Sequence, residues 1–349
     1  MNIKDFGTLS DGRKARLFIL KNDCIEVSVS DYGASLISLF VPDKNNHPVD
    51  IVLGFDSVLE YETDAGTYIG CNVGRNANRI GSGKFVLNGI TYNLDKNDGE
   101  KNNLHSGLHP YSKRLWTVEE SSDNSITFSL ESPDMDQGFP GNLKLYINYT
   151  LTDKNQLKIT YEGTPDADTV INVTNHSYFN LNGQGNGDIL NLNLTVFADN
   201  FTPTDQYSIP TGEIKSVNGT PMDFRSSKPI GQDIAKDYMP LKMAGGYDHN
   251  WCINNYDSNL QKVIKVTSTI TGITMEMETD YPGVQIYTAN YISNVKGKSN
   301  SVYQEKSAVC FEPQFFPDAV NHENFPQPIC KAGEKYHKEI VYTFNSSTN

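Results

Sequence analysis

Alternation of apolar and polar residues is the most regular pattern along this chain. It is clearest in residues 143–151 (LKLYINYTL) and recurs in residues 25–30, 157–161 and 192–198. Successive side chains of a β-strand point to opposite faces, so an alternating segment buries one face and leaves the other in solvent. The pattern therefore predicts many half-buried strands.

Turn and helix signals are fewer than strand signals. Residues 85–92 (FVLNGITY) are predicted to form a tight hairpin, because Asn88 and Gly89 suit the two positive-φ positions of a type I′ turn. Helical periodicity is sparse, and one short helix is predicted in residues 229–238.

The spacing of these elements predicts the fold class. Short strands separated by glycine, asparagine, aspartate and proline are typical of a sandwich or barrel. Residues 202–224 and 294–306 are long and polar, and we expect them to be rim loops or insertions. The predicted fold is all-β, a large antiparallel β-sandwich with few short helices. Because all-β architectures often exceed the usual domain size, residues 1–349 are predicted to form a single domain.

Charge and cysteine content exclude several classes of protein. The net charge of −13 would repel phosphate backbones, so nucleic acid is not an expected partner. The cysteines are odd in number and scattered, and no C-x-x-C pair occurs, which argues against a disulfide framework and a zinc site. The chain opens without a secretory leader pattern, and no apolar run approaches membrane-spanning length. We therefore expect a cytoplasmic protein without membrane contact.

Five segments break the strand pattern with dense polar and aromatic content. They are residues 74–80 (GRNANRI), 102–107 (NNLHSG), 174–181 (TNHSYFNL), 246–250 (GYDHN) and 311–318 (FEPQFFPD). Amides, carboxylates and guanidinium groups bind hydroxyls, and aromatic rings pack on the apolar face of a pyranose. Together these segments predict a site for a polyhydroxylated ring.

The content and order of the five segments resemble the motifs of the aldose 1-epimerase (galactose mutarotase) family. Residues 282–287 (PGVQIY) resemble a sixth motif, and Ser106 stands where the family usually has glycine. The resemblance covers most of the chain. It implies a β-supersandwich with an open sugar cleft and no cofactor or metal. It also implies an isomerase that interconverts the α and β anomers of free hexoses such as galactose and glucose.

The same resemblance assigns residues to the reaction. It implies His176 as the general acid and Glu312 as the general base. It also implies substrate contacts at Asn78, Arg79, His105, Tyr178, Asp248 and Gln285.

Anomer exchange explains why an acid and a base are both needed. An anomer inverts at C1 only after the ring opens, so a base removes the proton of the C1 hydroxyl while an acid protonates the ring oxygen. His176 must then be protonated while Glu312 is ionised, and Asp248 could supply the negative charge that supports the imidazolium. Arg79 and His105 could favour negative charge on the opening sugar.

Two other functions are alternatives to mutarotation. An epimerase acting on hexose 6-phosphates would need a basic cluster, and the motifs contribute only Arg75 and Arg79. A non-catalytic sugar-binding protein of the same fold would be indicated by loss of the acid or the base, and both are present. The expected partner is a monosaccharide, and the expected state is a monomer or a homodimer.

Three residues allow a second interpretation. Arg75 serves either the site or a structural ion pair. His105 and His109 have the i, i+4 spacing of metal ligands on a helix, but Gly107 and Pro110 disfavour a helix there, so a metal site is not predicted.

Overall fold

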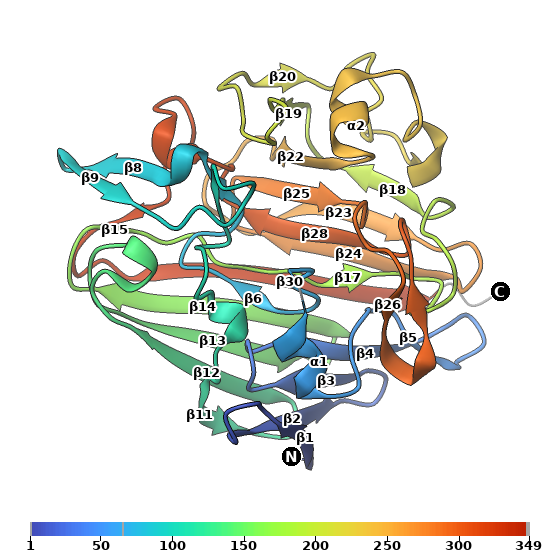
Figure 1. The fold of residues 1–349 in the computed structure, drawn as a ribbon. Helices are drawn as coiled ribbons and strands as arrows, with labels where there is room; N and C mark the ends of the chain where they lie inside the picture. The colour runs from blue at the N-terminus through green and yellow to red at the C-terminus, as the bar shows by residue number, and fades with distance from the viewer. Residues whose placement is uncertain (1, 65, 347–349) are drawn as a thin grey trace.

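The computed structural model describes residues 2–64 and 66–346, mostly as β-strands (Figure 1). Within these residues there are two α-helices, α1 (Val58–Thr63) and α2 (Met239–Ala244), and both are short. The described residues also include single turns of 3-10 helix. None of the helices in these residues has the length and the apolar character needed to span a bilayer. The 3-10 turns are η1 (Gly81–Gly83), η2 (Tyr111–Lys113), η3 (Asp136–Gly138), η4 (Ile230–Gln232), η5 (Lys298–Asn300) and η6 (Ala319–Asn321).

One layer of the fold is a long antiparallel sheet of nine strands within the described residues. In spatial order these are β11 (Thr117–Ser121), β12 (Ser125–Ser132), β13 (Leu143–Leu151), β14 (Gln156–Pro165), β30 (Tyr336–Ser346), β24 (Ile273–Thr279), β23 (Gln261–Thr267), β18 (Asn193–Val196) and β21 (Lys228–Pro229). Buried and half-buried residues alternate along all of β13, as its sequence predicted.

Two smaller sheets form the opposite layer. The first runs β17 (Tyr178–Phe179), β28 (Val309–Gln314), β25 (Gly283–Tyr287), β22 (Asp248–Cys252), β19 (Asn200–Thr202) and β20 (Lys215–Ser216). The second runs β1 (Asn2–Thr8), β2 (Lys14–Lys21), β3 (Glu26–Ser30), β4 (Leu36–Pro42) and β5 (Pro48–Asp50). Five two-stranded ladders complete the described strands: β6 (Asn72–Val73) with β16 (Thr174–Asn175), β7 (Arg79–Ile80) with β10 (Asn103–Leu104), β8 (Lys84–Leu87) with β9 (Ile90–Asn93), β15 (Thr169–Val170) with β29 (Ile329–Cys330), and β26 (Val295–Lys296) with β27 (Val302–Tyr303).

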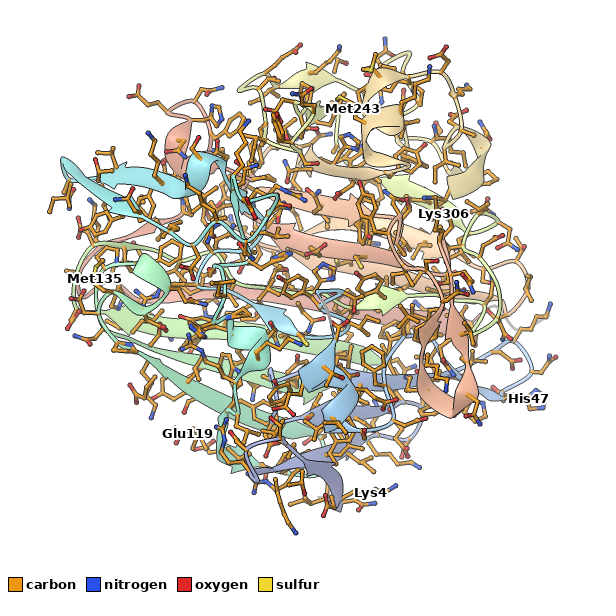
Figure 2. All side chains as sticks on the ribbon, in the orientation of Figure 1. Lys4, His47, Glu119, Met135, Met243 and Lys306 are labelled. Carbon is orange, nitrogen blue, oxygen red and sulfur yellow. The ribbon has the colours of Figure 1, made fainter. Side chains whose placement is uncertain are left out.

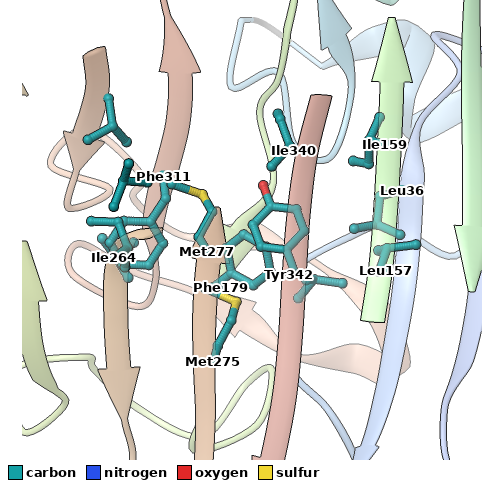
Figure 3. Close-up of a cluster of buried hydrophobic side chains, with 14 of the residues drawn as sticks. Leu36, Leu157, Ile159, Phe179, Ile264, Met275, Met277, Phe311, Ile340 and Tyr342 are labelled. Carbon is teal, nitrogen blue, oxygen red and sulfur yellow. The ribbon is translucent and has the colours of Figure 1, made fainter. Parts of the chain in front are cut away.

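The main hydrophobic core lies between the two layers. Phe179 of β17 packs on Tyr342 of β30 with ring centroids 5.2 Å apart, and Figure 3 shows Phe311 of β28 beside them. Phe18 of β2 meets Phe128 of β12 edge to face at 5.8 Å, which joins the second small sheet to the same core. The all-β sandwich prediction is therefore confirmed.

The alternation of the strands also explains the surface. Polar side chains such as those of Lys4, His47 and Glu119 lie on the outside of the layers (Figure 2). Along an alternating strand such as β13, the polar half of the pattern faces outward while the apolar half fills the core.

The local predictions had mixed outcomes. The hairpin is confirmed, since β8 and β9 are joined by Asn88 and Gly89 at φ 51° and 77°. The helix predicted in residues 229–238 is wrong, because that segment has only the turn η4, and α2 begins directly after it. Proline in the first turn of α2 is compatible with a helix start, since the first backbone N–H groups have no helical partner.

Helix α1 was not predicted, although its start carries a recognisable signal. Ser57 and Glu60 form a capping box, and the backbone N–H of Ser57 donates to Glu60 Oε2 at 2.9 Å. Residues 294–306, expected as a loop, contain the paired strands β26 and β27.

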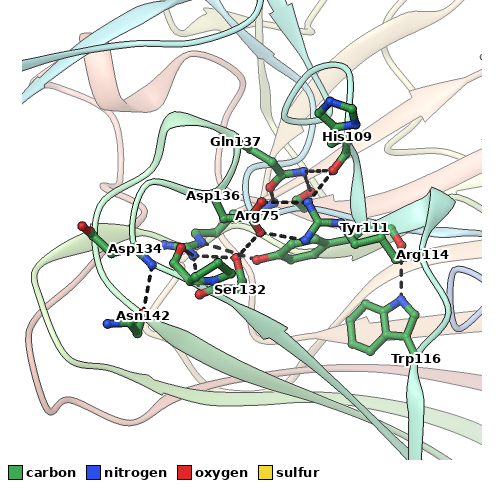
Figure 4. Close-up of polar contacts among 12 residues, drawn as sticks. Arg75, His109, Tyr111, Arg114, Trp116, Ser132, Asp134, Asp136, Gln137 and Asn142 are labelled. Carbon is green, nitrogen blue, oxygen red and sulfur yellow. Dashed lines mark hydrogen bonds and ion pairs between the residues drawn. The ribbon is translucent and has the colours of Figure 1, made fainter.

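Arg75 belongs to the scaffold. Its guanidinium is fully buried and donates from Nη1 to the carbonyls of Pro140 and Gly141 at 2.8 and 2.9 Å. Nη2 donates to the carbonyl and the hydroxyl of Ser132, and Nε donates to the hydroxyl of Tyr111 (Figure 4). The structural alternative is therefore the right one, with carbonyls and hydroxyls as partners in place of the expected ion pair.

We expect Arg75→Lys to lower the free energy of unfolding by about 3 kcal/mol, measured by urea denaturation. Lysine has three donors and no planar fork, so several buried carbonyls would lose their partner. Arg13→Lys, at a pair exposed to solvent with Asp11, is the matched control and should leave stability nearly unchanged. An equal loss in both variants would contradict the structural role of Arg75.

Candidate active site

All residues predicted for the site line one cleft of about 240 Å³. The structure thus brings together segments that lie far apart in sequence. The predicted residues in this cleft are Asn78, Arg79, His105, His176, Tyr178, Asp248, Gln285 and Glu312.

Neighbouring strands supply one wall of the cleft. Asp248 lies on β22, Gln285 on β25 and Glu312 on β28, and these three strands are adjacent in the sheet. Gln285 is the direct cross-strand partner of Glu312, and its Nε2 donates to Asp248 Oδ1 at 2.7 Å. Cross-strand partners lie on the same face of a sheet, so the register of β25 and β28 places these polar groups side by side.

A short ladder supplies the opposite wall. Asn78 precedes β7 with φ at 61°, and His105 follows β10. The backbone N–H of Asn78 donates to His105 Nδ1 at 3.1 Å, and the backbone N–H of His105 donates to the carbonyl of Asn78 at 3.0 Å. Ser106 braces the same turn, because its hydroxyl accepts from the N–H of Asn76 and donates to the carbonyl of Asn76.

The hydrogen bond from Asn78 fixes the protonation of His105. Since Nδ1 accepts that bond, the single proton of the neutral ring is on Nε2. Burial lowers the pKa of His105 well below its usual value, and His176 and Arg79 lower it further. His105 is therefore a neutral N–H donor in the cleft.

Three side chains of the cleft are potential metal ligands. His105, His176 and Glu312 place ligand atoms within 4.8 Å of one another. A histidine nitrogen that binds a metal carries no proton, and His105 keeps its proton on Nε2 as long as Nδ1 accepts from Asn78. The arrangement fits a hydrogen-bonding role better than a metal centre.

Backbone and ring contacts hold His176 in place. Its N–H donates to the carbonyl of Cys71 at 2.8 Å, and its carbonyl accepts from the N–H of Gly70 at 3.0 Å. Its ring stacks on Tyr178 with centroids 5.0 Å apart, while the Tyr178 hydroxyl donates to the carbonyl of Thr67. The hydroxyl of Tyr178 is thus engaged, and its ring is the part that shapes the cleft.

His176 faces Glu312 across the cleft, with Nε2 and Oε1 3.7 Å apart. Burial lowers the pKa of His176 to about 4. Burial also raises the pKa of Glu312 well above its usual value, and the charge of Asp248 raises it further, against the effect of Arg79. Burial thus disfavours the charged form of each group, so the pair favours a single shared proton over two separate charges.

Asp248 has a different electrostatic effect from the one suggested by the sequence. Its charge acts on Glu312, and the pKa of His176 is set by burial and a backbone hydrogen bond. Glu312 Oε2 is buried without a hydrogen-bond partner among the described residues, so it is available to a ligand hydroxyl.

Sequence reasoning identified Tyr178 but missed the other tyrosines that line the cleft within the described residues. Tyr287 stands two residues after Gln285 on β25, so the period of two could have identified it. Tyr291 stacks on Tyr287 at the mouth, and Tyr68 contacts His105 with ring centroids 4.6 Å apart. Tyr68 lies outside every motif, and no sequence signal marks it. The other lining residues that were not predicted are Gly66, Thr67, Leu104 and Ile292.

Comparison with known proteins gives a consistent result. The profile of the aldose 1-epimerase family matches residues 16–343. The chain is 38% identical to a galactose mutarotase from Sus scrofa, covering 97% of both chains. It is 35% identical to an aldose 1-epimerase from Escherichia coli K12, covering 96% of both chains.

Solved structures are similar over nearly the whole chain. An aldose epimerase homologue from C. elegans has a TM-score of 0.87 and 33% identity, covering 95% of this chain and 99% of that one. A galactose 1-epimerase from Lactobacillus acidophilus has a TM-score of 0.86 and 25% identity, covering 99% of this chain and 98% of that one.

Asp98 also lies outside the predicted set of site residues, and its contact with Arg79 leads to a testable prediction. Arg79 Nε donates to Asp98 Oδ2 at 2.8 Å, which leaves the two Nη groups to the cleft. Asp98→Asn removes the charge that orients the guanidinium, so we expect KM for the sugar to rise about fivefold to tenfold.

Steady-state polarimetry would measure this effect. Asp136→Asn is the matched control, because Asp136 pairs with Arg114 through two 2.8 Å hydrogen bonds and neither residue lines the cleft. An unchanged KM in Asp98→Asn would show that Asp98 does not orient Arg79.

Proposed function

We infer the function from one premise: this chain belongs to the aldose 1-epimerase family. It is an isomerase that interconverts the α and β anomers of an aldose. The assignment of that chemistry to particular residues is our proposal. The observation that supports it is the approach of His176 Nε2 to Glu312 Oε1, 3.7 Å apart within one sugar-sized cleft.

We propose that Glu312 removes the proton of the C1 hydroxyl while His176 protonates the ring oxygen. The bond between C1 and the ring oxygen breaks, the aldehyde forms, and rotation about C1–C2 presents its other face. Ring closure reverses both proton transfers. Opening leaves a protonated Glu312 and a neutral His176, which are the forms that burial favours in the empty cleft.

The pair thus needs only one shared proton. The two microstates, imidazolium with carboxylate and imidazole with carboxylic acid, differ in where that proton lies. Either group can begin the reaction, according to the anomer that is bound. A reversible isomerisation requires this exchange of roles.

The remaining lining residues suit a hexose. Arg79 and the Nε2–H of His105 are donors for sugar oxygens, including an oxygen that gains negative charge during opening. Asp248 accepts from hydroxyls, and Asn78 and Gln285 offer amide groups. We propose free hexoses, with galactose or glucose as the preferred class.

Charge disfavours the alternative of a hexose 6-phosphate. Among the described residues that line the cleft, Arg79 is the only arginine or lysine, and it already donates to Asp98. Asp248 and Glu312 lie in the same cleft, and a phosphate dianion would need a denser set of donors.

Four accompanying expectations remain predictions. Isomerisation transfers no electrons and no group between molecules, so we propose that no cofactor is required. We also propose a cytoplasmic location and a monomeric or homodimeric state, with the whole chain as a single domain.

Polarimetry on freshly dissolved α-galactose would test the function. We expect the protein to accelerate the approach to equilibrium, and to act at least about tenfold less well on galactose 6-phosphate. His176→Asn and Glu312→Gln should each lower kcat about 10²- to 10⁴-fold, because each removes one proton-transfer group. Circular dichroism would confirm that both variants fold. Near-full activity in either variant would exclude the role assigned to that residue.

The pH profile provides an independent test. The reaction needs one proton on the pair, so kcat/KM should fall in acid, where both His176 and Glu312 carry a proton, and in base, where neither does. The lowered pKa of His176, about 4, places the acidic limb below the usual histidine range, and the raised pKa of Glu312 places the basic limb above the usual carboxyl range. Rates corrected for buffer catalysis would locate both limbs. An acidic limb near pH 6.5 would contradict the buried neutral imidazole.

A further inference from the structure

Two histidines lie in this cleft with ring centroids 5.4 Å apart, and they differ in the partner of Nδ1. His105 Nδ1 accepts from a backbone N–H, which can only donate. His176 Nδ1 lies 3.6 Å from the sulfur of Cys310. The proposed proton transfers do not involve that thiol.

The position of Cys310 follows from the strand geometry of β28. Cys310 and Glu312 are two residues apart, so their side chains point to the same face of the strand. The imidazole of His176 lies between them, with Nδ1 at the sulfur and Nε2 at the carboxyl group. Cys310 is the cross-strand partner of Tyr178, and the ring of His176 stacks on Tyr178. Tyr178 therefore contacts a third side of the imidazole.

The chemistry of a thiol suits this place. Cys310 is fully buried, and burial raises the pKa of its thiol, with a further contribution from the charge of Asp248. The sulfur therefore keeps its proton, and it can donate weakly or accept weakly. It can donate to a bare Nδ1 when His176 is neutral, and it can accept from Nδ1–H when His176 is charged.

We propose that Cys310 is a positioning residue for His176. It holds Nε2 toward Glu312 and remains a partner of Nδ1 in both protonation states of the ring. A carboxylate in its place would favour the imidazolium, and a donor-only group would favour the neutral ring, as at His105. A thiol that can both donate weakly and accept weakly lets the ring gain and lose a proton within one turnover. The inference rests on the acid–base role proposed for His176.

The first test compares Cys310→Ala with Cys310→Ser. We expect Cys310→Ala to lower kcat about tenfold with KM within about twofold, because proton transfer at Nε2 loses its alignment while the sugar contacts remain. Cys310→Ser, which restores a group that donates and accepts, should recover most of the loss. The matched control is Cys252→Ala, since Cys252 is also buried in this sheet and packs among Phe316, Ala319 and Phe325.

The second test observes His176 directly. In the sugar-free protein, the ¹⁵N chemical shifts of the His176 ring report its tautomer, and Cys310→Ala should change them while Cys252→Ala should not. Cys310→Asp should move the acidic limb of kcat/KM upward by about one pH unit or more, since a carboxylate favours the imidazolium. If the aspartate variant does not fold, the alanine and serine variants decide.

Two results would overturn the proposal. One is unchanged kcat together with unchanged His176 nitrogen shifts in Cys310→Ala. The other is an acidic limb that stays in place in a folded Cys310→Asp. The nitrogen shifts are measured without turnover, so they test the contact with Cys310 even if His176→Asn were to disprove the catalytic role of His176.

Discussion

Burial of His176 and Glu312 is the constraint on which the proposed chemistry depends. Both side chains are almost completely buried, and burial makes the charged form of each group costly. Buried residues beneath these two side chains hold them in place. Asn175, the residue before His176, donates to the carbonyl of Gly70 at 3.0 Å, and the carbonyl of His176 accepts from the N–H of the same glycine. These buried hydrogen bonds hold the backbone on both sides of His176, so they keep the imidazole in the cleft.

The sequence predicted what local pattern encodes. Period two identified the strands, Asn88 and Gly89 identified the hairpin, and the resemblance to the aldose 1-epimerase motifs implied eight residues that line one cleft. It did not predict that Cys310 contacts His176. That contact depends on the register of β17 against β28, and the two residues lie 134 positions apart along the chain. The structural role of Arg75 was undecided for the same reason, since its partners lie on segments that no motif connects to it.

The two histidines show why a motif gives the identity of a site residue more readily than its protonation. His105 and His176 are both buried, and burial lowers the pKa of both. Their roles differ because their neighbours differ: a backbone N–H fixes the proton of His105 on Nε2, whereas His176 meets a thiol at Nδ1 and a carboxyl group at Nε2. The first arrangement suits a constant hydrogen-bond donor, and the second suits a group that exchanges a proton. Neither neighbour set is visible in the composition of the motifs.

The charges around Glu312 suggest how a sugar would prepare the pair for reaction. Asp248 raises the pKa of Glu312 and Arg79 lowers it, so the carboxyl group lies under two opposing charges in addition to the larger effect of burial. Within the proposed function, a hydroxyl that donates to Asp248 would weaken the first charge, and a hydroxyl that donates to the free Oε2 of Glu312 would stabilise the carboxylate directly. Both contacts move the shared proton toward His176. The substrate itself would therefore shift the buried pair toward the form that opens the ring.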